Sequence, residues 1–266
     1  MTTLGGSMFI RQAVEFDYCV APALDSLCAA CDDVVILDCQ STDGTLDVLR
    51  QCAARNANLR IVEGGPWEIA PDFNRLRILA DLARGHLKTD YHLMLQADEV
   101  IHERSLSFIK AVVADARWKA FLCRRFNLYG DLNHYVRFDL EQGRKPCSDQ
   151  VVRLALTRFP AHGDAESLAV PAGTSTASYL DSLVIYHYGL VRRDANHLDK
   201  IVSMQSWFFG NPAVVDKRVL EMKATSGRFE WERMYSARDL HKLPYPHPVF
   251  SAEWAAERQA EKAAIA

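Results

Sequence analysis

The first 120 residues alternate between short apolar runs and longer stretches with helical spacing. The apolar runs predict strands at Met8–Arg11, Val34–Asp38, Leu59–Val62 and Tyr91–Leu95. Apolar residues recurring every three or four positions predict helices over Tyr18–Ala30, Leu46–Cys52, Pro71–Ala83 and Glu103–Ala116. Strands that alternate with helices predict a parallel sheet covered on both faces.

After residue 120 the pattern becomes a series of strands with polar interruptions, followed by helices. Strands are predicted at Phe121–Tyr129, Tyr135–Phe138, Val151–Leu156 and Leu183–His187. Helices are predicted at Asn196–Phe209, Ala213–Lys223 and Ser251–Ala264. The fold class is therefore α/β, with a doubly wound half over residues 1–130 and a mixed half with C-terminal helices over residues 131–266, in one compact unit.

Two of the predicted parallel strands end in acidic residues. Asp38 closes one of them, and Asp98 and Glu99 close the stretch Tyr91–Glu99. Because ligands of open parallel sheets bind outside the carboxyl ends of the strands, we expect these acids to meet at one cleft. Asp98 and Glu99 are adjacent, so only one of them can easily face it. Carboxylates at such a cleft indicate a hard divalent cation and a phosphorylated ligand.

Each acid also has a structural interpretation. Asp38 can accept hydrogen bonds from backbone N–H groups of the turn Ser41–Gly44, and Asp43 is well placed to cap the helix that follows. Alternatively, Asp38 accepts a hydrogen bond from a ligand N–H group such as a pyrimidine imide. Asp98 and Glu99 can form a surface turn before the next helix.

Composition limits the classes of partner. The chain has 266 residues, 49% hydrophobic and 24% charged, with a net charge of −3, so no basic excess indicates nucleic acid or an anionic membrane. There is no signal-peptide pattern and no apolar stretch of the roughly 18–20 residues that a membrane span needs. A cytoplasmic protein without a transmembrane segment is expected. Cys28 and Cys31 are expected to be buried and reduced.

Several common motifs are absent from the sequence. There is no G-x-G-x-x-G for a dinucleotide and no G-x-x-x-x-G-K-[ST] for a nucleoside triphosphate. G-x-S-x-G and H-E-x-x-H are missing too. These absences argue against dinucleotide-dependent enzymes, P-loop NTPases, serine hydrolases of that type and zinc proteases.

Four segments resemble family 2 glycosyltransferases of the GT-A fold. VVILDCQSTDGT is similar to their D-x-x-S-T-D-G-T strand, turn and helix, and LMLQADEVIHE to their L-D-A-D-E segment, a variant of the D-x-D metal motif. FNRLRILADLARGHLKTDY resembles the helix that leads to that motif. IYHYGLVRRDANHLDK resembles the H-Y-G-x-x-R segment late in related GT-A enzymes. The first three similarities fall within residues 8–130.

The resemblance implies a binding site for a nucleotide-sugar, most simply a UDP-sugar. Asp38 would contact the nucleotide base, with Ser41 and Asp43 in the same motif. Asp98 would coordinate Mg²⁺ or Mn²⁺ on the diphosphate, and His187 would be the late metal ligand or a diphosphate contact. The remaining donor-side candidates are Arg75 and Arg77, for the diphosphate, and Gln96, which replaces the first acid of D-x-D and can hydrogen-bond a ribose hydroxyl.

The implied reaction is direct displacement at the anomeric carbon with inversion, in which a carboxylate deprotonates the acceptor hydroxyl. Asp164 and Glu166 are the preferred candidates for this base, and Asp149 is the second choice. Residues 1–130 would form the nucleotide-sugar-binding half, and residues 131–266 the acceptor-side half.

Two other functions stay open. A sugar nucleotidyltransferase would want a glycine-rich, basic loop after the first strand, where this chain has RQAVEFDYCVAP. A degenerate nucleotide-sugar-binding module is suggested by Gln96. The sequence leaves the oligomeric state and the acceptor open: saccharide, lipid-linked saccharide, protein, or a hydroxymethylated base in DNA. The last would need a basic surface, to which Arg124, Arg125, Arg137, Arg144, Lys145, Arg192 and Arg193 could contribute.

Overall fold

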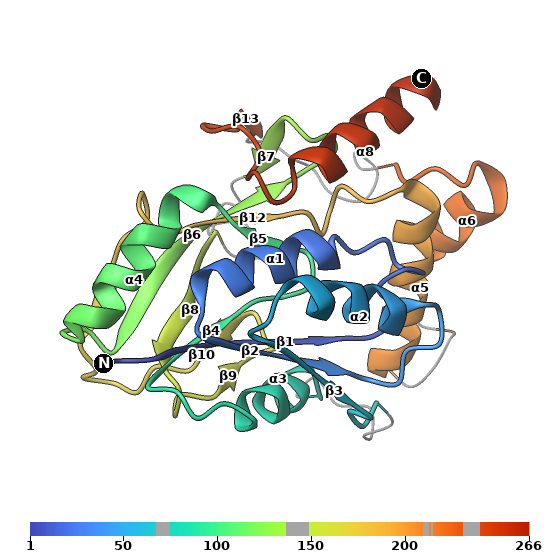
Figure 1. Ribbon diagram of the computed structural model, residues 1–266. Coiled ribbons are helices and arrows are strands. Elements are labelled where there is room, and N and C mark those ends of the chain that lie inside the picture. The colour runs from blue at the N-terminus through green and yellow to red at the C-terminus, as the bar shows by residue number, and fades with distance from the viewer. Residues whose placement is uncertain (68–74, 137–148, 210–212, 214, 231–239, 266) are drawn as a thin grey trace.

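A computed structural model describes residues 1–67, 75–136, 149–209, 213, 215–230 and 240–265. Its main feature is one large mixed sheet with helices against both faces (Figure 1). The strand order along its main path is β13-β7-β6-β8-β4-β1-β2-β3. The predicted α/β class, with a doubly wound mixed sheet and C-terminal helices, is confirmed.

Four parallel strands make up the first part of the sheet, in the order β4-β1-β2-β3. They are β1 (Leu4–Ile10), β2 (Asp33–Asp38), β3 (Leu59–Glu63) and β4 (Tyr91–Met94). The helices between them are α1 (Val20–Ala30), α2 (Thr45–Arg55) and α3 (Arg75–Gly85). Figure 1 shows α1 and α2 on one face and α3 on the other. The central strands β1 and β2 are almost wholly buried, which explains their unbroken apolar sequence.

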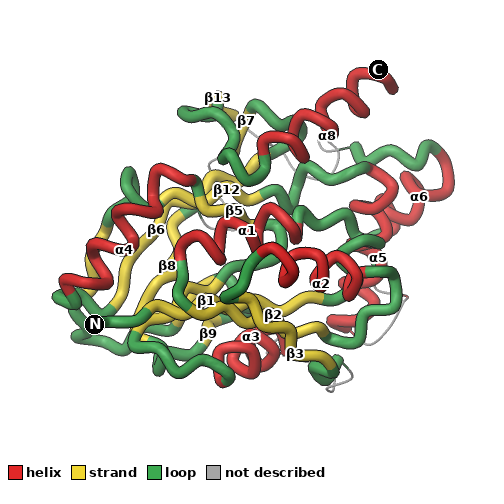
Figure 2. Tube along the Cα trace, viewed as in Figure 1, coloured by secondary structure: helices red, strands yellow, loops and turns green. Residues whose placement is uncertain are grey.

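The rest of the sheet, whose strands are yellow in Figure 2, is mixed. Much of it pairs in the antiparallel sense. Its strands are β5 (Glu99–Ile101), β6 (Ala120–Leu128), β7 (His134–Val136), β8 (Gln150–Leu156), β11 (Thr176–Ser178), β12 (Val184–His187) and β13 (Leu240–Lys242). A separate hairpin joins β9 (Ala161–His162) to β10 (Ser167–Leu168). The helices are η1 (Glu103–Ser105), α4 (Leu106–Asp115), α5 (Asp194–Phe209), α6 (Lys217–Thr225) and α8 (Ala252–Ile265).

The parallel strand order reverses at β1. The chain proceeds outward from β1 to β2 and β3, and then returns to place β4 on the other side of β1. In open α/β sheets this reversal leaves a crevice outside the carboxyl ends of the two neighbouring strands, where ligands bind. Here the crevice lies after Ile10 of β1 and after Met94 of β4.

The sequence prediction was wrong at the second acidic strand end. The stretch Tyr91–Glu99 is not one strand, because β4 ends at Met94 and Glu99 begins the separate strand β5. A tight turn divides them, in which Glu99 N donates to the Gln96 carbonyl at 3.0 Å and Gln96 N donates to Glu99 Oε2 at 3.0 Å. The chain therefore leaves the parallel sheet and pairs with β12 in the antiparallel sense.

Two smaller predictions can be compared with the structure. Cys28 and Cys31 are buried free thiols, and burial raises the pKa of Cys28 to about 12. Helix α6 begins at Lys217, later than the predicted start at Ala213, since Asp216 accepts a hydrogen bond from Arg218 N as its N-cap. Among the described helices, none combines the length and the apolar character that crossing a membrane requires.

Candidate active site

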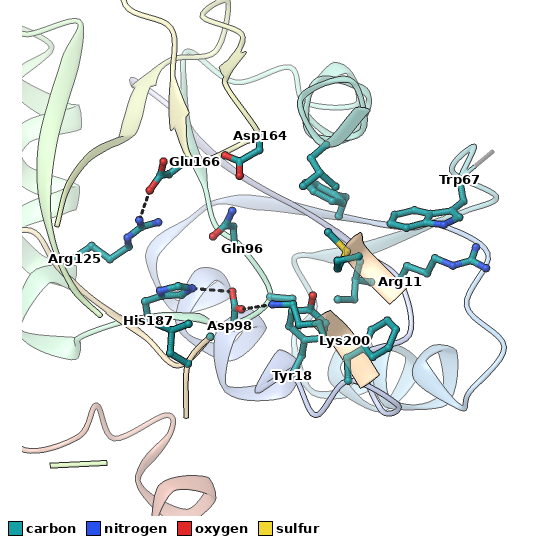
Figure 3. A pocket seen from close by; sticks show the side chains of 18 residues that line it. Arg11, Tyr18, Trp67, Gln96, Asp98, Arg125, Asp164, Glu166, His187 and Lys200 are labelled. Atoms are coloured by element: carbon teal, nitrogen blue, oxygen red, sulfur yellow. Dashed lines mark hydrogen bonds and ion pairs between the residues drawn. The ribbon is translucent and has the colours of Figure 1, made fainter. Parts of the chain in front are cut away.

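A pocket of about 280 Å³ lies at the crevice between β1 and β4 (Figure 3). Its wall is built from both parts of the chain: the end of β1, the turn before β5, the loop between β9 and β10, the segment after β12, and α5. Trp67 and Arg11 stand at one end in Figure 3, Asp98 near the middle, and Asp164 and Glu166 toward the other end.

Asp98 is fixed at the pocket by strand pairing. Because β5 and β12 run antiparallel, with His187 opposite Glu99, the end of β12 lies beside the acidic turn. Tyr188 N donates a hydrogen bond of 2.8 Å to the Asp98 carbonyl. Gly189 is required here, because a Cβ on it would come within 2.9 Å of Asp98 Oδ2. The H-Y-G sequence therefore packs directly against Asp98.

The two oxygens of the buried Asp98 carboxylate have different neighbours. Oδ1 faces His187 Nε2 at 3.6 Å. Oδ2 accepts a hydrogen bond from Arg192 Nη2 and lies 3.7 Å from Lys200 Nζ. Burial alone would raise the pKa of Asp98, but His187, Lys200 and Arg192 outweigh it and hold that pKa well below its ordinary value. Asp98 is therefore ionised at neutral pH.

His187 is oriented by its other nitrogen. Its Nδ1 lies 2.9 Å from Asn127 Oδ1, and since an amide oxygen only accepts, Nδ1 is the donor. Nε2 then faces Asp98, either as the donor of an imidazolium or as a lone pair available to a metal ion. A histidine that donates one ring N–H to an oxygen and presents the other nitrogen is the usual arrangement of a metal-binding histidine.

These two side chains suit a divalent cation. Asp98 Oδ1 and His187 Nε2 are close enough to hold one ion between them, and the hydrogen bond that His187 Nδ1 donates to Asn127 supplies the outer support. Within the described ranges, no three His, Cys, Asp or Glu side chains converge as a ready-made metal cage. Two protein ligands, with phosphate oxygens and waters for the rest, are typical of Mg²⁺ sites that bind nucleotides.

Glu99, next in sequence, points away from the pocket. Its Oε1 accepts hydrogen bonds from Arg125 Nη1 at 3.0 Å and from Arg153 Nη2 at 2.5 Å, and all three side chains are fully buried. Burial would raise the pKa of Glu99, but Arg153 and Arg125 together lower it. Only Asp98 of the adjacent pair faces the cleft, in agreement with the expectation for neighbouring residues.

The same two arginines reach the loop that carries the candidate bases. Arg125 Nη2 donates to Glu166 Oε1 at 2.6 Å, and Arg153 Nη1 donates to the Ala165 carbonyl at 2.9 Å. Gln96 Nε2 also contacts that carbonyl, at 3.4 Å. Ala165 has a left-handed backbone with φ of 64°. The loop is therefore held in a strained conformation by buried groups.

Asp164 and Glu166 both line the pocket but have different environments. Arg125 compensates the charge of Glu166. Asp164 is exposed to solvent on the pocket wall. Partial burial raises the pKa of Asp164, and the Glu166 carboxylate adds to this rise. The raised pKa makes Asp164 a stronger base than an ordinary aspartate.

The first acidic strand end does not line this pocket. Asp38 is buried, and its Oδ2 accepts a hydrogen bond from Ser41 N at 3.1 Å, as in the structural interpretation. Ser41 Oγ accepts from Gln12 N at 3.0 Å, and Asp43 Oδ1 accepts from Thr45 N at 3.1 Å. The turn thus uses all three side chains, and the predicted contact of Asp38 with the nucleotide base stays a prediction. Asp38 Oδ1, however, is buried without a hydrogen-bond partner among the described residues.

Three further candidates lie away from the pocket wall. Arg75 is buried at the start of α3, and Arg77 borders a separate depression on the outer side of that helix. Neither side chain lines the pocket, and their contact with the diphosphate stays a prediction. Asp149 lies 3.6 Å from Arg124 and does not line the pocket, so it is poorly placed to act as the base.

Four further residues are candidates for function: Arg125, Arg153, Arg192 and Lys200. Two of them, Arg125 and Arg192, were expected only as parts of a basic surface. Arg192 had a signal, since it is the arginine of the H-Y-G-x-x-R segment. Arg125 and Arg153 lie on interior-facing positions of β6 and β8, where a charged residue among apolar ones indicates a buried partner. Lys200 lies on α5 without a motif around it.

Sequence comparisons give no family: no family model matches the chain, and no curated protein matches it either. Among solved structures, S. aureus TarS 1–349 in complex with UDP has a TM-score of 0.48 and 14% identity, over 85% of this chain and 73% of that chain. The same TarS segment in complex with UDP-GlcNAc has a TM-score of 0.47 and 14% identity, over 85% of this chain and 74% of that one. The mannosyltransferase PcManGT from Pyrobaculum calidifontis, in complex with GDP-Man and Mn²⁺, has a TM-score of 0.46 and 14% identity, over 99% of this chain and 76% of that one. TM-scores below 0.5 mark a partial likeness, so the case for function rests on the pocket.

Proposed function

We propose that this protein is a metal-dependent, inverting glycosyltransferase of the GT-A type, which moves a sugar from a nucleotide-sugar to a hydroxyl group. One observation carries the proposal: Asp98 and His187 lie together at the switch point of the sheet, and Asp164 faces the same pocket from another loop. The arrangement provides a site for a diphosphate and a base, which are the two elements that direct glycosyl transfer needs.

The nucleotide end of the pocket is assigned to Trp67 and Arg11. The Arg11 guanidinium lies over the Trp67 ring at 5.0 Å and also donates to the Cys39 carbonyl at 3.0 Å. Cys39 directly follows Asp38, whose buried Oδ1 can accept one further hydrogen bond. One acceptor suits the single N–H of uracil, which favours a UDP-sugar. Residues 1–130 thus supply most of the donor site.

The residues that would hold Mg²⁺ or Mn²⁺ are Asp98, through Oδ1, and His187, through Nε2. A cation bound there would neutralise negative charge on the donor diphosphate. The chain's own part is to keep Asp98 ionised and to keep the His187 ring in place through Asn127. Gln96, which lines the pocket beside them, is left to hydrogen-bond a ribose hydroxyl.

Asp164 is assigned as the base, on the acceptor side formed by residues 131–266. As the acceptor oxygen attacks the anomeric carbon, Asp164 takes its proton. The bond from that carbon to the diphosphate oxygen breaks, and its electron pair leaves with the nucleoside diphosphate. Attack from the face opposite the leaving group inverts the configuration. Glu166 stays paired with Arg125 and raises the basicity of Asp164.

The proposed basic surface for DNA is weakened, because Arg125 and Arg192 are buried and bound to carboxylates. Arg137, Arg144 and Lys145 lie outside the described residues.

A screen of nucleotide-sugars tests the function. With Mn²⁺ or Mg²⁺, UDP should raise the melting temperature, and a UDP-sugar should be slowly hydrolysed in the absence of acceptor. If no nucleotide shifts the melting temperature with either metal, the proposal is wrong. Binding of a UDP-sugar without turnover, unchanged in Asp98→Ala, would indicate a binding module instead.

A further inference from the structure

The cations around Asp98 are not equivalent. Arg192 is fully buried and uses each of its nitrogens: Nε donates to the Gly189 carbonyl at 3.1 Å, Nη1 to the Phe16 carbonyl at 2.6 Å, and Nη2 to Asp98. Its positive charge is thus committed to Asp98. Arg125, elsewhere on the pocket wall, is likewise bound to two carboxylates.

Lys200 is different. It reaches the pocket from α5, its side chain is 21% exposed, and its ammonium lies 3.7 Å from Asp98 Oδ2, beyond hydrogen-bond distance. It also lies over the Tyr18 ring at 5.0 Å from the centroid. Figure 3 shows Lys200 and Tyr18 together beside Asp98, facing the cavity. Within the described part of the chain, none of the three donors of this ammonium has a hydrogen-bond acceptor.

The charge count at this point of the pocket leaves Lys200 in excess. Asp98 contributes one negative charge, which Arg192 already balances at hydrogen-bond contact. Gln96, beside Asp98 on the pocket wall, adds no charge. A cation with unused donors in the wall of a partly enclosed pocket attracts an anion, because such a site is only weakly screened by solvent.

We propose that Lys200 is a catalytic residue that binds the diphosphate of the donor and stabilises the departing nucleoside diphosphate. This inference rests on the proposed function. The Lys200 ammonium moves a short distance from Asp98 to a phosphate oxygen, guided by the Tyr18 ring. When the bond to the anomeric carbon breaks, the electron pair goes to the diphosphate oxygen, and Lys200 donates a hydrogen bond to the phosphate without giving up its proton. Lys200 thereby supplies positive charge at a site where the neutral Gln96 adds no negative charge.

The test compares UDP with uridine, which lacks the phosphates, in wild type, Lys200→Met and Lys200→Arg. Lys223→Met is the matched control, because Lys223 lies on neighbouring α6, paired with Asp199 and outside the pocket wall. Affinities are measured by calorimetry, with Mn²⁺ and with EDTA. Lys200→Met should lose about 10- to 100-fold in UDP affinity, with the larger loss in EDTA, and keep its uridine affinity. Lys200→Arg should retain part of the UDP affinity, and Lys223→Met all of it.

The outcomes separate this inference from the function on which it rests. If Lys200→Met binds UDP as tightly as wild type does under the same conditions, the role of Lys200 is refuted and the function stands. An equal loss for UDP and uridine would also refute it, by indicating a general structural effect. If wild type binds UDP neither with Mn²⁺ nor with EDTA, the proposed function itself fails. The melting temperatures of the variants show whether each one folds.

Discussion

The parallel and mixed parts of the sheet contribute to the pocket in different ways. In the parallel part, β1 and β4 end at the crevice, which places Arg11 directly after β1 and the turn that carries Asp98 after β4. In the mixed part, Asp164 and His187 arrive through long-range pairing and buried ion pairs. The parallel part thus forms the binding crevice through its strand order, and the mixed part supplies the groups that set the reactivity of the pocket.

Asp164→Asn tests the reactive role of the mixed part and should have the largest effect. Loss of the base should lower kcat by roughly 10²- to 10⁴-fold, with little change in UDP affinity. Steady-state kinetics with the identified donor and acceptor measure it. Asp149→Asn is the control, since Asp149 does not line the pocket. Equal losses in the two variants would contradict the assignment.

Glu99→Gln tests the link between the two parts. Glu99 joins the acidic turn to Arg125 and Arg153, and removing its charge leaves two buried arginines without their shared carboxylate. The free energy of unfolding should fall by about 3–5 kcal/mol. Denaturant unfolding measures it, with the exposed Asp47→Asn as control. A loss under about 1 kcal/mol, which is typical of surface pairs, would show that this network is not what joins the two parts.

Asp98→Asn tests the binding role of the parallel part. The amide keeps one acceptor oxygen but loses the charge, so turnover should drop by roughly 10²- to 10³-fold and the dependence of UDP affinity on Mn²⁺ should disappear. Calorimetry with and without the metal measures this. If the variant responded to Mn²⁺ as wild type does, the cation would have to be held elsewhere.

Glu166→Gln should give the smallest effect, a change in pH dependence. The raised pKa of Asp164 places the acidic limb of kcat/KM above the ordinary range for aspartate, with activity falling as pH drops through that pKa. Removing the neighbouring negative charge lowers the pKa of Asp164, so the limb should move to lower pH. A profile of kcat/KM against pH measures it. A limb that stays in place would contradict Asp164 as the titrating base.

The same contrast explains what the sequence could predict. The strands of the parallel part were predictable because each is a continuous apolar run, and Asp98 was expected at the cleft because it follows one of these runs. Glu99 was expected to close a strand, whereas it begins one. A strand of three residues is too short to show a periodic pattern in the sequence. The resemblance of the H-Y-G segment led to His187, whose register against Glu99 the sequence does not show.

The remaining gaps have physical causes. Asp38 was expected to contact the nucleotide base; the turn at Ser41 takes up one of its oxygens, and the other is buried without a hydrogen-bond partner among the described residues. Arg125, Arg153 and Lys200 act through partners far away in the sequence, which neither hydrophobic spacing nor a local motif can pair. Charge on an interior strand position signals that a partner exists without identifying it.

A crystal structure of the protein with UDP and Mn²⁺ tests the central claim most directly. We expect that structure to show the uracil near Trp67 and Arg11 and Mn²⁺ bound by Asp98 and His187. The diphosphate should lie within reach of Lys200, with Asp164 across the pocket. UDP bound outside this pocket, or Mn²⁺ held by other side chains, would contradict it.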